Sequence, residues 1–270
     1  MTDRGFNQLM VYIDQLGRKI ELPSSPKRII SLVPSQTELL YYLGLRDEVV
    51  GITKFCIHPE EWFRSKTRVG GTKKLNFETI RELQPDLIIG NKEENEKDQI
   101  EHLMQNYPVW MSDIYTLNDA LDMINRIGAL AHTQQQALFL KLNLEASFRQ
   151  LEGLNQNNPV KTAAYFIWKN PMMVAGQNTF INDMLSKCGL KNVFDSDARY
   201  PEITPQLLAE KRPELILLSS EPYPFKEKDV QEFQAICPWA KIMVVDGELF
   251  SWYGSRLLEA PPYFEKLFTK

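Results

Sequence analysis

Short apolar runs alternate with helical patterns along the chain, and this alternation predicts an α/β fold. Residues 28–33 form a β-branched run bounded by prolines, which is typical of a buried strand. The next apolar positions follow helical spacing up to Gly44, a residue type common just beyond a helix C-terminus. A second strand-like run covers residues 49–52, so this region is predicted to be a β–α–β unit.

Two capping motifs mark where helices are expected to begin. Ser35 and Glu38 form an S-x-x-E capping box after the first strand, and Thr133 and Gln136 form a T-x-x-Q box further along. A continuous helix over residues 133–153 would be about 30 Å long. Such a helix predicts a rigid connection rather than a flexible linker.

The two halves of the chain repeat one another in pattern. Residues 83–89, LQPDLII, match residues 211–217, KRPELIL, so that Pro85 is equivalent to Pro213. The run that ends at Gly44 also resembles the run that ends at Gly189. A repeat of this kind predicts two α/β lobes of similar plan. The expected organisation has three parts: an N-terminal lobe at 1–130, a linking helix at 133–153 and a C-terminal lobe at 159–270.

The carboxyl ends of the predicted strands are the expected place for a binding site. In open α/β sheets ligands bind beyond these ends, and pockets are common between domains. A ligand cleft between the two lobes is therefore predicted. The candidate ligand-binding residues at strand ends are Ser35, Gln36, Phe55 and Lys92 in the first lobe and Trp168 in the second.

Composition and charge exclude some classes of function. The 270 residues carry a net charge of −4 and no Lys/Arg run, so nothing indicates nucleic-acid binding. No apolar segment approaches the length of a membrane span, so no membrane insertion is expected. The first apolar run, residues 9–13, is too short for a secretory leader, which fits a cytoplasmic protein or an exported one after leader removal.

The sequence FCIHP places Cys56 and His58 two residues apart on an extended segment. Their side chains would point the same way and could bind a metal, with Glu93 or Glu94 adding an oxygen ligand. The alternative is a structural loop with a buried thiol and a histidine bonded to a carbonyl. The chain has three cysteines without a C-x-x-C pair, so no disulfide framework or zinc knuckle is indicated.

A glycine-rich segment, VGGTKK at residues 69–74, could bind an anionic group. Its glycines would let backbone N–H groups approach the anion, with Thr72 and Lys73 assisting. The segment lacks the order of residues found in a P-loop. The alternative is a tight turn that needs glycine for positive φ angles.

An aromatic segment, FSWYGSR at residues 250–256, could form a wall for a large flat ligand. Trp252 and Tyr253 would stack on the ligand, and Arg256 would bind a carboxylate or phosphate. The alternative is a C-terminal segment that packs on the second lobe. Tyr200, which follows Arg199, is a further candidate ligand-binding residue.

Three stretches together resemble one known class of proteins. They are RIISLVPSQTELLYYLG at 28–44, VGGTKKLNFETIRELQPDLIIG at 69–90 and MMVAGQNTFINDMLSKCG at 172–189. The class is that of the helical-backbone substrate-binding proteins of ABC importers, which bind cobalamin, haem, ferric siderophores and related chelates. The resemblance covers nearly the whole chain and is greatest to the cobalamin-binding members. It implies two Rossmann-like lobes, one linking helix, a cleft with little closure, and a periplasmic or cell-surface location.

The resemblance also implies a permease as partner, and the sequence departs from the cobalamin-binding members at two positions. In the cobalamin-binding members each lobe offers a surface glutamate to arginines of the permease. Glu78 matches the first of these positions, and Gln206 stands at the second, with the same spacing as Pro85 and Pro213. Thr72 stands where a cobalamin binder offers a tryptophan.

The resemblance and the strand-end residues predict a protein that binds a metal chelate and is not an enzyme. The expected ligand is a corrinoid, haem or a ferric siderophore, no cofactor is required, and an ABC permease is the expected partner. The alternative is a cytoplasmic metal- or corrinoid-handling protein or enzyme that uses Cys56 and His58 as metal ligands.

Overall fold

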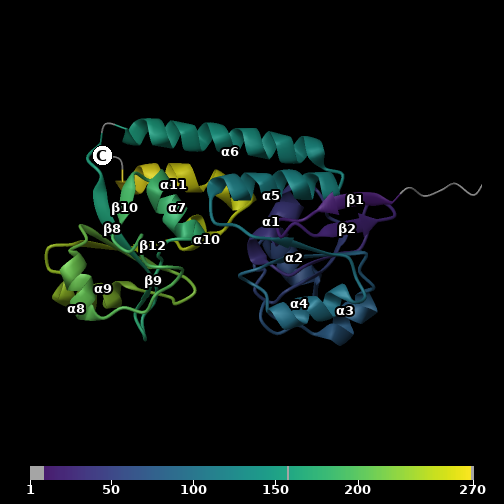
Figure 1. The fold of residues 1–270 in the computed structure, drawn as a ribbon, viewed down its shortest axis with the longest axis horizontal. Helices are drawn as coiled ribbons and strands as arrows, with labels where there is room; N and C mark the ends of the chain where they lie inside the picture. Colours follow the sequence, from purple (N-terminus) through teal and green to yellow (C-terminus); the bar gives the residue numbers. More distant parts are fainter. Residues whose placement is uncertain (1–8, 157, 269–270) are drawn as a thin grey trace, which may run out of the picture. The chain divides into compact units, whose positions relative to one another are not determined.

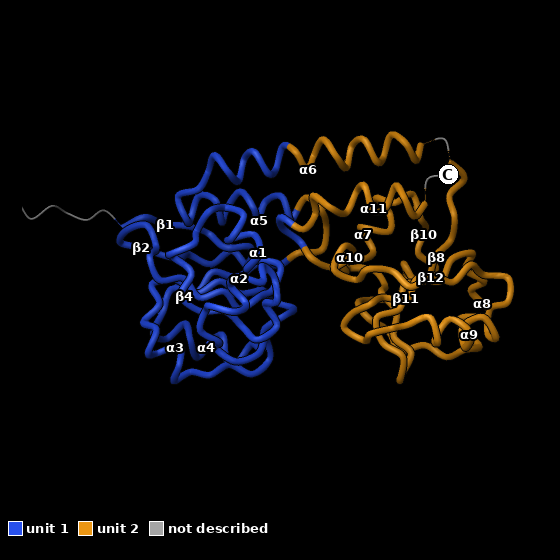
Figure 2. The backbone as a smooth tube through the Cα atoms, turned by 180° about the vertical axis from the view of Figure 1, so that it is seen from behind, with its two compact units in different colours: residues 1–113, 119–142, 253–255 blue, residues 114–118, 143–252, 256–270 orange. Residues whose placement is uncertain are grey.

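The structure is a computed structural model that describes residues 9–156 and 158–268. Its internal contacts divide the chain into two compact units (Figure 2). Unit 1 takes the chain up to residue 113, together with 119–142 and 253–255. Unit 2 takes 114–118, 143–252 and the residues from 256 onward. Each unit therefore combines segments that are distant in the sequence.

Unit 1 is built on a five-stranded parallel sheet with the order β5-β4-β3-β6-β7. An antiparallel hairpin of β1 and β2 precedes this sheet (Figure 1). Parallel strands need crossover connections, and helices supply several of them. The elements are β1 (Met10–Ile13), β2 (Lys19–Leu22), β3 (Ile29–Ser31), α1 (Pro34–Tyr42), β4 (Val49–Ile52), α2 (Glu60–Ser65), β5 (Thr67–Arg68), α3 (Phe77–Leu83), β6 (Leu87–Asn91), α4 (Lys97–Met104) and β7 (Val109–Ser112).

Unit 2 contains a sheet of the same plan. Its strands β10-β8-β11-β12 are parallel, and the short β9 pairs with β8 in the antiparallel sense. The elements are β8 (Lys161–Trp168), β9 (Met173–Val174), α7 (Phe180–Lys187), β10 (Leu190–Asn192), α8 (Pro205–Lys211), β11 (Leu215–Ser219), α9 (Glu227–Ile236), β12 (Lys241–Val245), α10 (Glu248–Ser251), the 3₁₀ helix η1 (Ser255–Leu258) and α11 (Ala260–Phe268).

Among the described residues, α5, α6 and the short η1 have residues in both units. The predicted long helix is α6 (Gln134–Asn155), and the division between the units falls after residue 142 within it. Helix α5 (Leu117–Leu130) begins in unit 2 and continues in unit 1. The predicted α/β class with parallel sheets is confirmed, whereas the lobe boundaries at 130 and 159 stay a prediction. Within the described residues no helix has the length and apolar character needed to cross a membrane.

Both predicted capping boxes are wrong. Helix α1 begins at Pro34 with Val33 as its N-cap, and no side chain caps it, so Ser35 lies inside the first turn. Proline suits the first helical position because its φ angle is fixed and it has no N–H to satisfy, which explains the earlier start. Before α6, the buried Oγ1 of Thr133 makes no hydrogen bond to any described residue.

The predicted end of α1 at Gly44 is confirmed. Gly44 has a φ of +87° and donates its N–H to the carbonyl of Tyr41 at 3.0 Å. The N–H of Leu45 reaches back to the carbonyl of Leu40 at 3.1 Å. These two bonds form a Schellman motif, which satisfies carbonyl groups that the helix end would leave unpaired.

The spacing of Pro85 and Pro213 also relates equivalent elements of the two units. Helices α3 and α8 have seven residues each, and their first residues, Phe77 and Pro205, are separated by the same spacing. Strands β6 and β11 have five residues each, are completely buried and start at the same spacing. In each sheet this strand pairs with the first strand of the parallel set, β3 or β8. The repeat seen in the sequence is therefore a repeat of the fold.

The ends of the two equivalent helices also correspond. Asn76 caps α3 by accepting the N–H of Thr79, and Thr204 caps α8 in the same way. At the other end Gln84 and Arg212 both adopt the left-handed conformation, with φ angles of 43° and 47°. This conformation is costly for a residue with a side chain, so both positions store strain.

A carboxylate fixes the amino end of the central strand pair in each unit. Asp86, just before β6, accepts the backbone N–H groups of Lys27 and Arg28 at 2.7 and 2.9 Å. Glu214, just before β11, accepts the N–H of Thr162 at 2.8 Å. Hydrogen bonds to an ionised group are stronger than neutral ones, so these residues align the first strand with its neighbour.

Replacing Gln84 with glycine is expected to stabilise unit 1. The strain of a left-handed residue, about 1–2 kcal/mol, exceeds the entropy that glycine adds to the unfolded chain, about 0.4–1 kcal/mol. We expect a gain of roughly 0.5–1 kcal/mol in the free energy of unfolding, measured as an increased midpoint in urea.

The matched variant Arg212→Gly is expected to gain less. The Arg212 guanidinium lies 4.6 Å from the centre of the Trp239 ring, and glycine loses this cation–π contact. Equal stabilisation by both variants would contradict this assignment, and destabilisation by Gln84→Gly would contradict the strain argument.

Candidate functional site

The carboxyl-terminal edge of the unit 1 sheet holds a buried polar network. Gln36 donates from Nε2 to Ser112 Oγ at 2.5 Å, and Asn91 Nδ2 donates to the same oxygen at 2.9 Å. Asn95 Nδ2 donates to the carbonyl of Thr72 at 3.1 Å, which ties the loop after β5 to the end of β6. Gln36 is fully buried, and its Oε1 has no hydrogen-bond partner among the described residues, an arrangement that costs free energy.

Ser35 lies where residues 253–255 pack on α1. Gly254 has a φ of +120°, a region that favours glycine. A Cβ at Gly254 would lie 3.2 Å from the carbonyl oxygen of Ser35 and 3.3 Å from Leu39 Cβ. Tyr253 is buried in the same segment. The predicted residues Ser35 and Tyr253 thus belong to the same part of unit 1.

Thr72 and Lys92 present different kinds of surface at this edge. Thr72 is buried, so its side chain offers little area to a ligand. Lys92 is exposed, and its Nζ forms an ion pair with Asp113 Oδ2 at 2.7 Å. The backbone N–H of Lys92 donates to the carbonyl of Ser112, which fixes the lysine at the end of β6.

Cys56 has the surroundings of a structural thiol. It is completely buried, and its Sγ lies 3.1 Å from Thr37 Oγ1 and 3.2 Å from Thr53 Oγ1. Burial raises the pKa of the Cys56 thiol, so the thiolate that a metal needs is disfavoured. Among the described residues no group of three or more His, Cys, Asp or Glu could hold a metal ion. Metal binding by Cys56 and the half-buried His58 stays a prediction, and these contacts favour the structural alternative.

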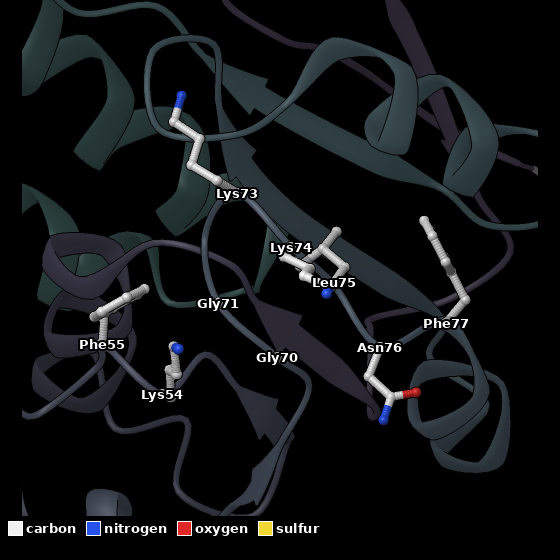
Figure 3. Close-up of a pocket in the computed structure, with 9 residues that line it drawn as sticks. All are labelled: Lys54, Phe55, Gly70, Gly71, Lys73, Lys74, Leu75, Asn76 and Phe77. Atoms are coloured by element: carbon white, nitrogen blue, oxygen red, sulfur yellow. The ribbon is translucent and has the colours of Figure 1, made fainter.

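An open pocket of about 630 Å³ lies beyond the carboxyl ends of β4 and β5 (Figure 3). Phe55 is 50% exposed and lies, with Lys54 beside it, on one side of the segment that carries Gly70 and Gly71. The predicted residue Phe55 therefore does line a cavity. The pocket is lined by Lys54, Phe55, Gly70, Gly71, Lys73, Lys74, Leu75, Asn76 and Phe77.

An aromatic pair stands at the carboxyl end of β8 in unit 2. Trp168 is 38% exposed and meets the ring of Tyr223 edge-on at a centroid distance of 5.6 Å. The indole N–H of Trp168 donates to the carbonyl of Asn170 at 3.0 Å, which holds the ring in place. Sequence reasoning missed Tyr223, although it lies only shortly beyond the end of β11.

A half-buried carboxylate orients the part of the predicted aromatic wall that lies in unit 2. Glu221 Oε1 accepts the indole N–H of Trp252 and the hydroxyl of Ser251, both at 2.9 Å. The Arg256 guanidinium lies 5.4 Å from the centre of the Trp252 ring and pairs with Glu248 at 3.6 Å. Trp252 and Arg256 are therefore brought together as predicted, while the sequence did not reveal the carboxylate that positions them.

Tyr200 belongs to a cation–π cluster in unit 2. The guanidinium of Arg199 lies 5.7 Å from the ring centre of Tyr200 and the same distance from that of Tyr115. Arg199 has a φ of +61° and donates from its side chain to the carbonyl of Asn178. The cluster presents a cation flanked by two aromatic rings.

Glu78 and Gln206 occupy equivalent surface positions. Each is the second residue of its helix, α3 or α8, and each is exposed. Glu78 forms a long ion pair with Arg81, at 3.8 Å, and its side chain remains 75% exposed. The equivalence predicted from the spacing of the two halves therefore extends to these two positions.

The carboxyl group of Glu221 is expected to make stability depend on pH. Burial raises the pKa of Glu221 above its ordinary value of 4.5, so as the pH rises the unfolded chain releases this proton first. The unfolded state then binds fewer protons than the folded state, and stability falls as the pH rises through this window. We expect Glu221→Gln to remove this fall, measured as urea midpoints over a series of pH values.

The exposed Glu210 on α8 provides the control for that experiment. Glu210→Gln removes one negative charge from the same unit without removing the half-buried carboxyl of Glu221. If the stability curves of the wild type and Glu221→Gln remain parallel over the pH series, the burial argument is wrong.

Comparisons with known proteins agree with this architecture. The family described as "Periplasmic binding protein" matches residues 29–243. A vitamin B12-binding protein of Pectobacterium carotovorum is 26% identical over 239 residues, which cover 87% of this chain and 86% of that protein.

Two solved structures have the same fold. The periplasmic vitamin B12-binding protein BtuF of Vibrio cholerae matches with a TM-score of 0.78 and 22% identity, over 91% of this chain and 99% of that one. A periplasmic haem-binding protein, RhuT of Roseiflexus, matches with a TM-score of 0.78 and 20% identity, over 89% and 98%. The resemblance to helical-backbone substrate-binding proteins of ABC importers is thereby confirmed, and the chain belongs to the periplasmic binding protein family.

Proposed function

We propose that this protein is a receptor for a metal chelate, either a corrinoid, haem or a ferric siderophore. The observation that carries the proposal is the similarity to a vitamin B12-binding protein over 87% of this chain. We include haem among the proposed ligands because a haem-binding protein has the same fold. We further propose that the protein binds and delivers its ligand without transforming it, and that it needs no resident cofactor.

The side chains at the carboxyl-terminal edges suit such a ligand. Large chelates offer flat apolar faces, which aromatic side chains cover well. Unit 1 presents Phe55, and unit 2 presents Trp168 and Tyr223 at the end of β8. We propose these aromatic residues as contacts of the ligand, with Arg256 and Lys92 as charged anchors.

Tryptophan fluorescence provides the test of this function. Cobalamin, haem and ferric siderophores are titrated in turn, with correction for the light that each ligand absorbs. We expect saturable quenching by one of them. In Trp168→Ala we expect affinity for that ligand to fall about tenfold, because loss of one aromatic contact costs roughly 1–1.5 kcal/mol.

Trp239→Ala is the matched control for Trp168→Ala. Trp239 is 41% exposed, close to the 38% of Trp168, but it precedes β12 and so lies at the amino end of the same sheet. Its replacement is expected to leave affinity unchanged. Flat titrations with all three ligands would refute the proposed function, and equal losses in the two variants would refute the assignment of Trp168.

We propose an ABC permease as the partner, contacted through Glu78 and the equivalent position of Gln206. The exposed carboxylate of Glu78 is available to an arginine, whereas Gln206 offers only an amide. This contact would therefore be weaker at unit 2. The location of the protein, either periplasmic or cell-surface or else cytoplasmic, stays a prediction.

A charge-exchange experiment tests the docking surface. The probe is a purified ABC permease of the vitamin B12 type in nanodiscs, and binding is measured by surface plasmon resonance. We expect Gln206→Glu to strengthen binding severalfold and Glu78→Gln to weaken it, because an ion pair is gained or lost. Unchanged binding in both variants would contradict docking through these positions.

A further inference from the structure

The pocket after β4 and β5 has a cationic lining in a chain of net negative charge. Three lysines line it, Lys54, Lys73 and Lys74, whereas the whole chain carries a net charge of −4. No Asp or Glu is among the lining residues. The pocket therefore has a local charge opposite to that of the protein as a whole.

Two of the three lysines have no carboxylate partner within the described part of the chain. Lys73 Nζ donates to the carbonyl of Glu93 at 2.7 Å and pairs with Glu96 at 3.6 Å, and in Figure 3 it extends away from Lys54. Lys54 Nζ lies 5.0 Å from the centre of the Phe55 ring, a cation–π contact that leaves its charge uncompensated. Lys74 forms no ion pair among these residues. The free positive charge of the pocket thus comes from Lys54 and Lys74.

Gly71 allows Lys54 and Phe55 to lie directly on the loop. A Cβ at Gly71 would stand 3.0 Å from Phe55 Cε2 and 3.3 Å from Lys54 Cε. Both distances are tighter than ordinary van der Waals contact. The ring and the lysine stem are therefore held against the peptide backbone, which positions an aromatic face and a cation beside the same cavity.

Hydrogen bonds hold the loop that carries Lys74. The side chain of Gln99 accepts the N–H of Leu75 at 2.7 Å and donates to the carbonyl of Lys73 at 2.7 Å. The N–H of Gly71 donates to the carbonyl of Lys74 at 2.8 Å, which closes the turn. Since the loop is fixed on both sides of Lys74, the two ammonium groups belong to a preformed pocket.

From this geometry we infer that the pocket binds a negatively charged group of the chelate. The protein then selects chelates with pendant carboxylate or catecholate oxygens over chelates with a neutral periphery. This inference rests on the proposed function and names the ligand class within it. Phe55 covers an apolar part of the ligand, and Lys54 and Lys74 compensate its charge. Thr72 and Lys73, the pair expected from the sequence, are less suited to this role, because Thr72 is buried and Lys73 pairs with Glu96.

Matched pairs of ligands separate charge from shape. Haem and its dimethyl ester share ring and iron but differ in their carboxylates. A ferric tricatecholate is an anion at neutral pH, whereas a ferric trihydroxamate is neutral. Affinities of the wild type, Lys54→Gln/Lys74→Gln and Lys54→Arg/Lys74→Arg are measured by fluorescence titration at low and high salt.

We expect the glutamine double variant to bind the anionic member of a pair about tenfold more weakly, with unchanged affinity for the neutral member. The arginine double variant should retain affinity, and added salt should weaken only the anionic ligand. Lys161→Gln/Lys191→Gln removes two exposed lysines from β8 and β10 of unit 2 and controls for net charge. This control should bind both members as the wild type does.

The outcomes separate the inference from the function on which it rests. If the wild type binds none of these chelates, the proposed function and the inference both fail. If the wild type binds a neutral chelate as tightly as its anionic partner, and the lysine variant changes neither, only the inference fails. Equal losses for both members of a pair, together with a lowered unfolding midpoint, would assign the lysines a structural role and overturn the inference.

Discussion

The parallel pairing of the central strands is the constraint on which the candidate site depends. Because β3 and β6 run in the same direction, as do β8 and β11, each of these pairs has its carboxyl ends at one edge. Asp86 and Glu214 bind backbone N–H groups at the opposite ends and so fix the alignment of these pairs. These two carboxylates, at the amino ends of the strands, thus help to determine which residues lie side by side at the carboxyl ends.

The repeated plan explains why much of the fold could be predicted from the sequence. The spacing of Pro85 and Pro213 correctly relates α3 to α8 and β6 to β11, because each pair packs in an equivalent place and needs the same apolar pattern. The end of α1 at Gly44 was also predictable, since a positive φ angle narrows the choice of residue. Elements whose residues are set by burial or by backbone conformation can therefore be predicted from a single sequence.

The side-chain contacts were less predictable because they depend on partners distant in the sequence. The S-x-x-E pattern at Ser35 predicts the wrong helix start, since Pro34 serves as the first residue. The FCIHP pattern suits a metal site, yet one of the contacts that bury Cys56 comes from Thr37, on α1. Lys73 and Lys74 are neighbours of the same type, but within the described residues only Lys73 pairs with a carboxylate, that of Glu96, which follows β6. No local pattern distinguishes them.

The fold leaves the choice of ligand to a few side chains at these edges. A parallel sheet of this plan serves proteins named for vitamin B12 and for haem, so its backbone alone does not discriminate between them. Discrimination requires groups whose interaction free energy differs between ligands. The proposed aromatic contacts, Phe55 and Trp168, suit any flat apolar surface and would therefore add affinity with little selectivity. Uncompensated charge differs in this respect, because an ammonium group gains from an anion and loses hydration beside a neutral group. The lysines of the unit 1 pocket are therefore the side chains best suited to determine which chelate binds.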